Sequence, residues 1–116
     1  MTRLVHRHDG NESVLATDVT VADSFLQQAR GLMFRSSFPG GSALVFPFDH
    51  AAKRTLHMVA VPFDIDALWI RDDRVEHVAR LSAWTGIGRG VADTVVELPA
   101  GAADSVSEGD VVRLDD

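Results

Sequence analysis

The sequence predicts a mainly β protein (a β-rich α+β fold), built as an antiparallel sandwich or partly closed barrel of seven to eight short strands with one helix near the N-terminus. Three observations predict this class: short apolar and β-branched runs, turn residues at short intervals, and a single segment with helical spacing. A chain of 116 residues that is 46% hydrophobic can build one packed core. We therefore expect a single domain over residues 1–116.

The first expected element is a β-hairpin. Apolar and polar residues alternate from Arg3 to His8, residues 9–12 read Asp-Gly-Asn-Glu, and extended character resumes from Val14 to Val19. Asp-Gly between two alternating runs is a strong signal for a tight hairpin turn.

The one expected helix covers Thr20 to Arg30. Val21, Phe25 and Ala29 recur at helical spacing, and Gly31 follows as a natural stop. Thr20 and the acid three positions later also resemble an N-terminal cap.

The remaining elements are short strands separated by turns. The expected strands span 43–48, 55–61, 66–70, 75–81, 94–98 and 111–114. Asp72-Asp73 marks a turn, and Pro47 and Pro99 mark strand ends. The glycines at 86, 88 and 90 predict a mobile or tightly turned loop.

Composition excludes several classes of protein. No cysteine is present, so disulfides, thiolate metal sites and cysteine catalysis are excluded. The net charge of −6 and the scattered basic residues argue against nucleic-acid binding. The N-terminal residues show no signal-peptide core, and no apolar run approaches the ~20 residues of a membrane span, which predicts a cytoplasmic protein without a membrane partner.

The charged residues are unusually biased in type. Asp (13) outnumbers Glu (4), and Arg (10) almost replaces Lys (1). Dense surface carboxylates keep a protein solvated at high salt, so we expect an acidic protein from a halophilic archaeon, with codon bias in a GC-rich genome as the alternative.

Six stretches carry a resemblance to a known family. In chain order they are Ala29-Arg30-Gly31-Leu32-Met33-Phe34-Arg35, Leu56-His57-Met58, Asp66, Leu81-Ser82-Ala83-Trp84, residues 93–101 (DTVVELPAG) and Gly109-Asp110. In these stretches the chain resembles the domain-of-unknown-function family numbered one hundred and ninety-two, over nearly its whole length. The resemblance implies a compact β-rich fold with one helix near the front, and no established activity.

Within these stretches we predict structural roles for seven residues. They are Arg30, Gly31, Glu97, Pro99, Gly101, Gly109 and Asp110. Positive charge suits a helix C-terminus, and Arg30 there could also form a buried ion pair with Asp66 or Glu97.

The candidate ligand-binding residues are His57, Met58, Asp66, Trp84 and Arg89. The segment from Trp84 to Gly90 combines a flat aromatic ring, a cation and bare backbone, which suits a sugar ring or another small polar ligand. In the alternative reading, Trp84 is a core side chain and the glycines only serve turn geometry.

His57 and Asp66 could also form an acid–base pair, since a carboxylate orients an imidazole and raises its pKa. Against this, such a His is more often a hydrogen-bonded strand residue and such an Asp a turn cap. No nucleophile lies in a recognisable motif, and we assign no catalytic residue. His6 and His8 lie two apart and could bind a metal weakly, but we predict no metal site and no cofactor.

The leading functional hypothesis is therefore a small ligand-binding or accessory domain, monomeric, for a carbohydrate or another small polar ligand. A hydrolase or lyase that uses His57 and Asp66 is the first alternative. A protein-interaction module without a small-molecule site is the second.

Overall fold

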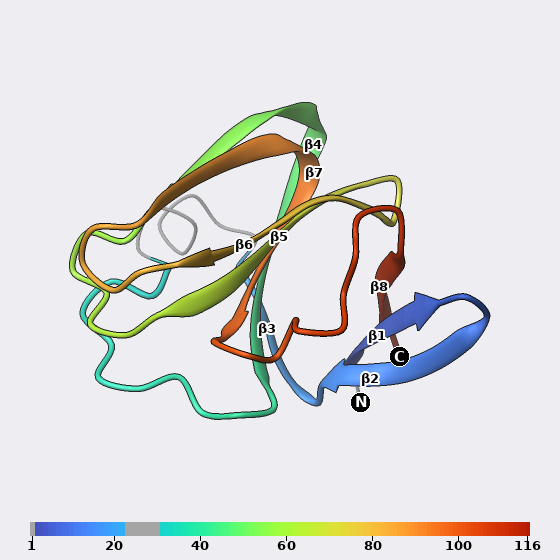
Figure 1. Cartoon of the computed structure of the whole chain (residues 1–116), viewed down its shortest axis with the longest axis horizontal. Helices are drawn as coiled ribbons and strands as arrows, with labels where there is room; N and C mark the ends of the chain where they lie inside the picture. Colours follow the sequence, from blue (N-terminus) through green and yellow to red (C-terminus); the bar gives the residue numbers. More distant parts are fainter. Residues whose placement is uncertain (1, 23–30) are drawn as a thin grey trace.

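A computed structural model describes residues 2–22 and 31–116 and confirms a mainly β protein with eight strands (Figure 1). The strands are β1 (Arg3–His8), β2 (Asn11–Ala16), β3 (Asp18–Val21), β4 (Ser42–His57), β5 (Ile65–Arg71), β6 (Arg74–Leu81), β7 (Ile87–Pro99) and β8 (Val111–Asp115). Within the described residues, no helix is long and apolar enough to cross a membrane.

All eight strands belong to one sheet, in the order β2-β1-β8-β6-β5-β7-β4-β3. The sheet does not close into a barrel, which corrects the expected sandwich or partly closed barrel. Neighbouring strands are antiparallel except β3 and β4, which are parallel. Between β6 and β8 the described residues show one pairing, Arg74 with Val111, so the two halves of the sheet can point in different directions (Figure 1).

Two tight turns form as the sequence predicts. His8 pairs with Asn11 and Arg71 pairs with Arg74, which leaves two-residue loops. Both residues of each loop have positive φ, 49° and 81° at Asp9-Gly10 and 51° and 65° at Asp72-Asp73. This is the type I′ geometry that matches strand twist, and Asp and Gly tolerate it better than most residues.

The predicted helix over Thr20–Arg30 is not found in the described part of the chain. Thr20 and Val21 instead complete β3, where Thr20 pairs with Leu44 and Val21 with Val45 of β4. The physical reason is that these β-branched residues pair with β4, which lies more than twenty residues further along the chain. The helical spacing of nearby apolar residues gives no information about that pairing. The rest of the predicted helix, residues 23–30 with Arg30, lies outside the described residues.

Two strands are longer than the sequence predicts. β4 runs through Pro47, where we expected an end, because the proline lies where the pairing with β7 breaks, between Pro47 and Ala52. β7 begins at Ile87, so most of the predicted glycine loop is strand. Residues 52–57 and 87–92 form a two-stranded extension of the sheet, which we call the arm.

Trp69 explains why the arm needs glycines. The Trp69 side chain is fully buried under the arm, and its indole Nε1 donates to the Arg54 carbonyl at 2.8 Å. A Cβ on Gly88 would lie 2.8 Å from this ring, and one on Gly90 would lie 2.9 Å from it. The glycines therefore make room for an aromatic side chain from β5, not for a turn.

Successive residues of the central strands point alternately to the two faces of the sheet, and their side chains form one apolar cluster on each face. The first includes Leu4, Val45, Leu68, Val96 and Val112. The second includes Leu44, Phe46, Met58, Trp69 and Val95. The second cluster lies beneath the loops that form the candidate site.

Candidate functional site

Three loops lie together at one end of the molecule, on the left in Figure 1, and hydrogen bonds between backbones join them. The Phe34 N–H donates to the Ala60 carbonyl at 2.8 Å, and the Trp84 N–H donates to the Val61 carbonyl at 2.9 Å. The Met58 N–H also donates to the Gly86 carbonyl at 3.0 Å. Loops 31–35, 58–61 and 82–86 therefore form one connected surface.

This surface carries four large apolar side chains that face solvent. Phe34 is 75% exposed, Ile87 70%, Trp84 60% and Val59 57%. We call these four residues the loop patch. Contiguous exposed apolar groups are uncommon on monomeric soluble proteins and mark interaction sites.

The backbone beneath the loop patch is strained. Phe34, Ala60 and Trp84 have φ values of 67°, 61° and 66°, the left-handed region that residues with a Cβ avoid. Each such residue costs about 1–3 kcal/mol, and such conformations concentrate at binding and catalytic sites. The three lie in three different loops, at the points where the loops bond to one another.

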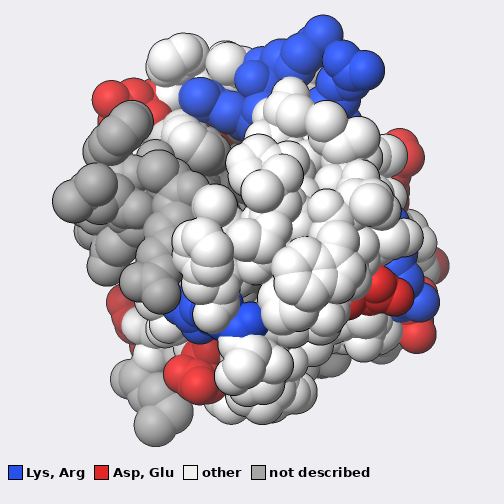
Figure 2. All heavy atoms as spheres, turned by 90° about the vertical axis from the view of Figure 1, so that its left-hand side faces the viewer, with Lys and Arg blue, Asp and Glu red and all other residues white. Residues whose placement is uncertain are grey.

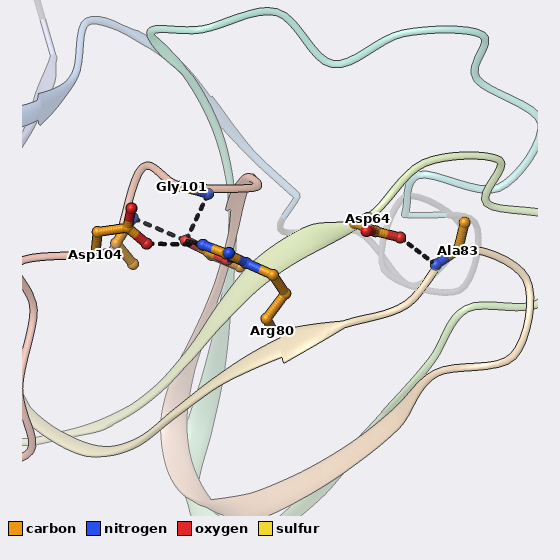
Figure 3. A network of polar contacts seen from close by, with 7 residues as sticks. Asp64, Arg80, Ala83, Gly101 and Asp104 are labelled. Atoms are coloured by element: carbon orange, nitrogen blue, oxygen red, sulfur yellow. Dashed lines mark hydrogen bonds and ion pairs between the residues drawn. The ribbon is translucent and has the colours of Figure 1, made fainter.

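Buried side chains and one carboxylate hold these loops in place. Leu32, Met58 and Val61 are each at most 2% exposed and anchor the loops on the second cluster. The Asp64 carboxylate accepts the Ala83 N–H at 2.8 Å, next to Trp84 (Figure 3).

The outer face of the arm extends the loop patch. Its cross-strand pairs are His57 with Ile87, Thr55 with Arg89 and Lys53 with Val91, and all six residues are exposed. We call these six residues the arm face. It alternates cationic and aliphatic side chains and has no carboxylate.

The charge of this region is opposite to that of the protein. Segments 31–35, 52–61 and 82–92 hold Arg35, Lys53, Arg54 and Arg89 and none of the 17 acidic residues. Figure 2 shows this side of the molecule, with a broad uncharged centre, basic side chains along the upper edge and acidic ones toward the margins. An acidic protein therefore presents one apolar and basic end.

The structure brings together three of the five predicted ligand residues. Trp84, His57 and Arg89 are exposed on the loop patch and the arm face. Met58 is buried beneath them, 1% exposed. The predicted alternative of Trp84 as a core residue does not fit its exposure.

Asp66, the fifth predicted residue, serves a different network (Figure 3). Its buried carboxylate accepts the Gly101 and Ala103 N–H groups, each at 3.0 Å, and the Arg80 Nε at 2.8 Å. Burial raises the pKa of Asp66, but these bonds outweigh it and lower the pKa below its usual value. Arg80 also reaches Asp104 at 2.7 Å, so the network fixes the loop after β7.

His57 does not pair with Asp66. Its Nδ1 accepts the Val59 N–H at 3.3 Å, a local bond, while the Asp66 oxygens are bound to the loop after β7. The geometry needed for an acid–base pair, with the base within hydrogen-bond reach of the acid, is therefore not formed.

A second buried network links the two ends of the chain. The Asp110 carboxylate is hydrogen-bonded to His6 Nε2 and to His8 Nδ1, each at 2.7 Å, and accepts the Ser107 N–H at 2.9 Å. Burial opposes ionisation, but these bonds lower the pKa of Asp110 to about 2. The hydrogen bond to Asp110 in turn raises the pKa of His8. The histidine pair that suggested metal binding thus shares one carboxylate.

Within residues 2–22 and 31–116, no group of three or more His, Cys, Asp or Glu side chains is arranged to hold a metal ion.

Glu97 is a further buried carboxylate, which lies on β7 and is 5% exposed. Burial raises its pKa to about 7, against the opposing charge of Arg35. Gly101 and Gly109 have φ values of 96° and 90°, which favour glycine at both turns.

An apolar groove of about 290 Å³ lies away from the loop patch. Its walls come from Leu4, Val21, Val45, Pro47, Ile70, Asp73, Thr94, Val96, Val112, Arg113 and Leu114. None of the predicted ligand residues lines it.

Sequence reasoning missed Phe34, Val59 and Ile87 of the loop patch. Their types suggest core residues, and only the folded structure shows that they are exposed. The sequence does carry one usable signal, because segments rich in apolar residues at 31–35, 52–61 and 82–92 hold only basic charges.

Two solved structures share the fold. A protein of unknown function from Novosphingobium aromaticivorans superposes with a TM-score of 0.82 at 22% identity, covering 96% of this chain and 83% of that one. A Sinorhizobium meliloti protein described as a candidate transcription regulator gives a TM-score of 0.81 at 23% identity, covering 97% and 93%. At these identities the likeness establishes the fold alone.

Sequence relatives come from two Thermococcus species. A UPF0127 protein of Thermococcus kodakarensis is 30% identical over 98 residues, 81% of this chain and 62% of the relative. A UPF0127 protein of Thermococcus gammatolerans is 30% identical over 101 residues, 84% of this chain and 66% of the relative. The chain thus spans a little under two thirds of the length of both relatives.

The profile of the uncharacterised family DUF192 matches residues 5–114, nearly the whole chain. Together with the two Thermococcus relatives, this match means that the chain belongs to the DUF192 family of uncharacterised proteins.

Proposed function

We propose that the protein is a binding module, and not an enzyme, which recognises its partner through the loop patch and the arm face. The observation that carries the proposal is the exposure of Phe34, Val59, Trp84 and Ile87 at one end of the fold, between 57% and 75% each. Exposed apolar area costs free energy, about 25 cal/mol for each Å² that could have been buried. A partner that covers these side chains removes their apolar area from water, and this free energy then favours binding.

The strained backbone supports the same proposal. Phe34 and Trp84 hold positive φ values while their N–H groups are bonded to a neighbouring loop. The hydrogen bonds fix both side chains in an outward position before any partner arrives. A preorganised contact loses less conformational entropy on binding than a flexible one.

The partner chemistry follows from the residue types. Trp84 offers a flat ring that can stack on an apolar face, including that of a sugar, and Arg89 and Lys53 offer cationic donors on the arm face. A carbohydrate or another small polar ligand would use Trp84 and Arg89 in this way. The other candidate is a larger anionic surface that contacts the loop patch and the arm face together.

Catalysis is disfavoured by the placement of the candidate acid and base. The Asp66 carboxylate is bonded to two backbone N–H groups and Arg80, away from His57. The proposal therefore assigns Asp66 a structural role.

The test is to map binding by two-dimensional ¹H–¹⁵N NMR during titration with oligosaccharides, nucleotides, acidic peptides bearing an aromatic residue, and lipid bicelles. We expect perturbed resonances to gather at Phe34, Val59, Trp84, Ile87 and Arg89. Trp84→Ser is expected to abolish the response, whereas Val14→Ser, which removes a 44% exposed valine from β2, leaves it unchanged. Perturbations that gather instead along the groove of Leu4, Val45 and Val112 would refute this binding surface.

A further inference from the structure

We infer that the loop patch and the arm face dock on an anionic lipid membrane surface. The inference rests on the proposed function and names the partner of the same site. It needs no membrane-spanning segment, because surface contact requires only exposed apolar side chains and nearby positive charge.

The charge of the loop patch and the arm face is complementary to an anionic membrane. The arm face carries the exposed cations Lys53 and Arg89 and no carboxylate, and Arg35 is exposed in segment 31–35, whereas the Arg54 guanidinium lies over the Phe48 ring on the other side of the arm. On a protein with net charge −6, an exposed surface that carries cations and no carboxylate is suited to contact a negative surface. The flanking carboxylate of Asp64 is bonded to the Ala83 N–H.

The apolar side chains of the loop patch protrude from the surface. Phe34, in loop 31–35, and Ile87, the first residue of β7, are 75% and 70% exposed, so both side chains protrude into solvent and do not line the wall of a deep cleft. A folded protein partner would need matching hollows for each of them, whereas lipid chains fit around protruding side chains of any arrangement. Trp84 adds an indole, the side chain that favours the boundary between headgroups and acyl chains.

Cationic side chains lie next to apolar ones on the arm face. The cross-strand pairs set Lys53 beside Val91 and Thr55 beside Arg89, so positive and aliphatic side chains share the arm face with Ile87. Long basic side chains at such an interface keep their charge at the headgroups while their stems rest on apolar surface.

The acidic remainder of the protein does not prevent this contact. The molecule measures 38 × 29 × 25 Å, and the Debye length is about 8 Å at physiological ionic strength. Acidic groups on the far side are therefore screened from the membrane. The net charge instead favours the orientation in which the loop patch faces the lipid.

The test is co-sedimentation of the intact protein with vesicles of phosphatidylcholine alone or mixed with phosphatidylserine. We expect binding to the mixed vesicles, little to phosphatidylcholine, and loss of binding at 1 M salt, where the Debye length falls to about 3 Å. Tryptophan emission reports the contact, because Trp69 is fully buried and Trp84 is 60% exposed. Emission should shift to shorter wavelength on binding, and Trp84→Phe should remove the shift.

Two double variants separate the apolar and charged contributions. Lys53→Ser with Arg89→Ser should weaken partitioning roughly 25-fold, at about 1 kcal/mol or fivefold for each charge. Phe34→Ser with Trp84→Ser should weaken it by at least roughly tenfold. Val14→Ser is the matched control, and thermal melting shows that each variant is folded.

Each outcome decides between the possibilities. Absence of binding to mixed vesicles overturns the membrane inference, and NMR perturbation of the same residues by an acidic aromatic peptide or a sugar would then leave the proposed function standing. Vesicle binding that Phe34→Ser with Trp84→Ser does not weaken also overturns the inference, because the attraction would be purely electrostatic. If no probe perturbs the loop patch, the proposed function fails as well.

Discussion

The indole of Trp69 fills the space that a side chain on Gly90 would need, since a Cβ there would lie 2.9 Å from Trp69 Cγ. We predict that Gly90→Ala destabilises the protein by about 1–3 kcal/mol, because a fully buried ring in a packed cluster cannot move aside freely. Gly40→Ala is the control, since nothing lies within 4 Å of its added Cβ. Urea unfolding of both variants measures the difference, and equal stability would contradict the packing.

A second prediction concerns Glu97, whose pKa is raised from 4.5 to about 7 by burial. The folded protein then binds this proton more tightly than the unfolded chain, so stability falls as pH rises from 4.5 to 7. The loss amounts to about 3 kcal/mol at most. Glu97→Gln should remove this slope, whereas the exposed Glu108→Gln should retain it. Melting temperatures between pH 4.5 and 6.5, where the contribution of His8 is still present in full, test this, and a slope retained in Glu97→Gln would assign it to another group.

The Asp110 network gives the opposite pH dependence. The pKa of Asp110 is lowered from 3.8 to about 2, so its contribution to stability is complete above pH 3.8 and disappears as pH falls through 2. Asp110→Asn should destabilise the protein at neutral pH, because His6 and the Ser107 N–H lose a charged acceptor. Asp49→Asn, on an exposed part of β4, is the control. Equal unfolding free energies for the two variants at pH 7 would refute the network.

His8 reports the same network directly. Its hydrogen bond to Asp110 raises its pKa above 6.5, so its contribution is present below pH 6.5 and is lost as pH rises through the raised value. An NMR titration of the imidazole should give a raised pKa in the native protein and a lower one in Asp110→Asn, where the charge of Asp9 still raises it. An identical titration curve in both proteins would contradict the bond.

The Asp66 network predicts an order of effects among three substitutions. Asp66→Asn should be the most harmful, by about 1–3 kcal/mol, because a buried charge acceptor for two backbone N–H groups is lost. Arg80→Ala should cost less, since Arg80 is 51% exposed, and Asp104→Asn least, since Asp104 is 72% exposed. Chemical denaturation of the three variants gives the order. A reversed order would show that the ion pair, and not the loop anchoring, provides the stability.

The fold was predictable where local chemistry decides it. Asp9-Gly10 and Asp72-Asp73 specify their turns by themselves, and β1, β5, β6 and β8 follow closely from alternation and turn spacing. Local chemistry was misleading where a distant partner decides. The glycines of the arm are needed because Trp69, about twenty residues away in the sequence, packs against them. Thr20 and Val21 form a strand because they pair with β4.

The candidate site was predictable in part for the same reason. Trp84, His57 and Arg89 stand out by residue type, and they do share one exposed surface. Asp66 was wrongly associated with His57 because the two lie close in sequence. The sequence does not reveal that Asp66 binds the backbone of the loop after β7. Phe34 and Ile87 could not be recognised, since exposure of an apolar residue is a property of the folded molecule.

The pairing of β1 with β8 places the two ends of the chain next to each other, with Arg3 opposite Asp115. Figure 1 shows both ends at the side of the molecule opposite the three loops. A fluorophore, an affinity tag or a fused domain attached at either end would therefore point away from the loop patch. A short linker joining the ends, with new ends cut at the Asp72-Asp73 turn, would give a circular permutant that keeps the loop patch intact.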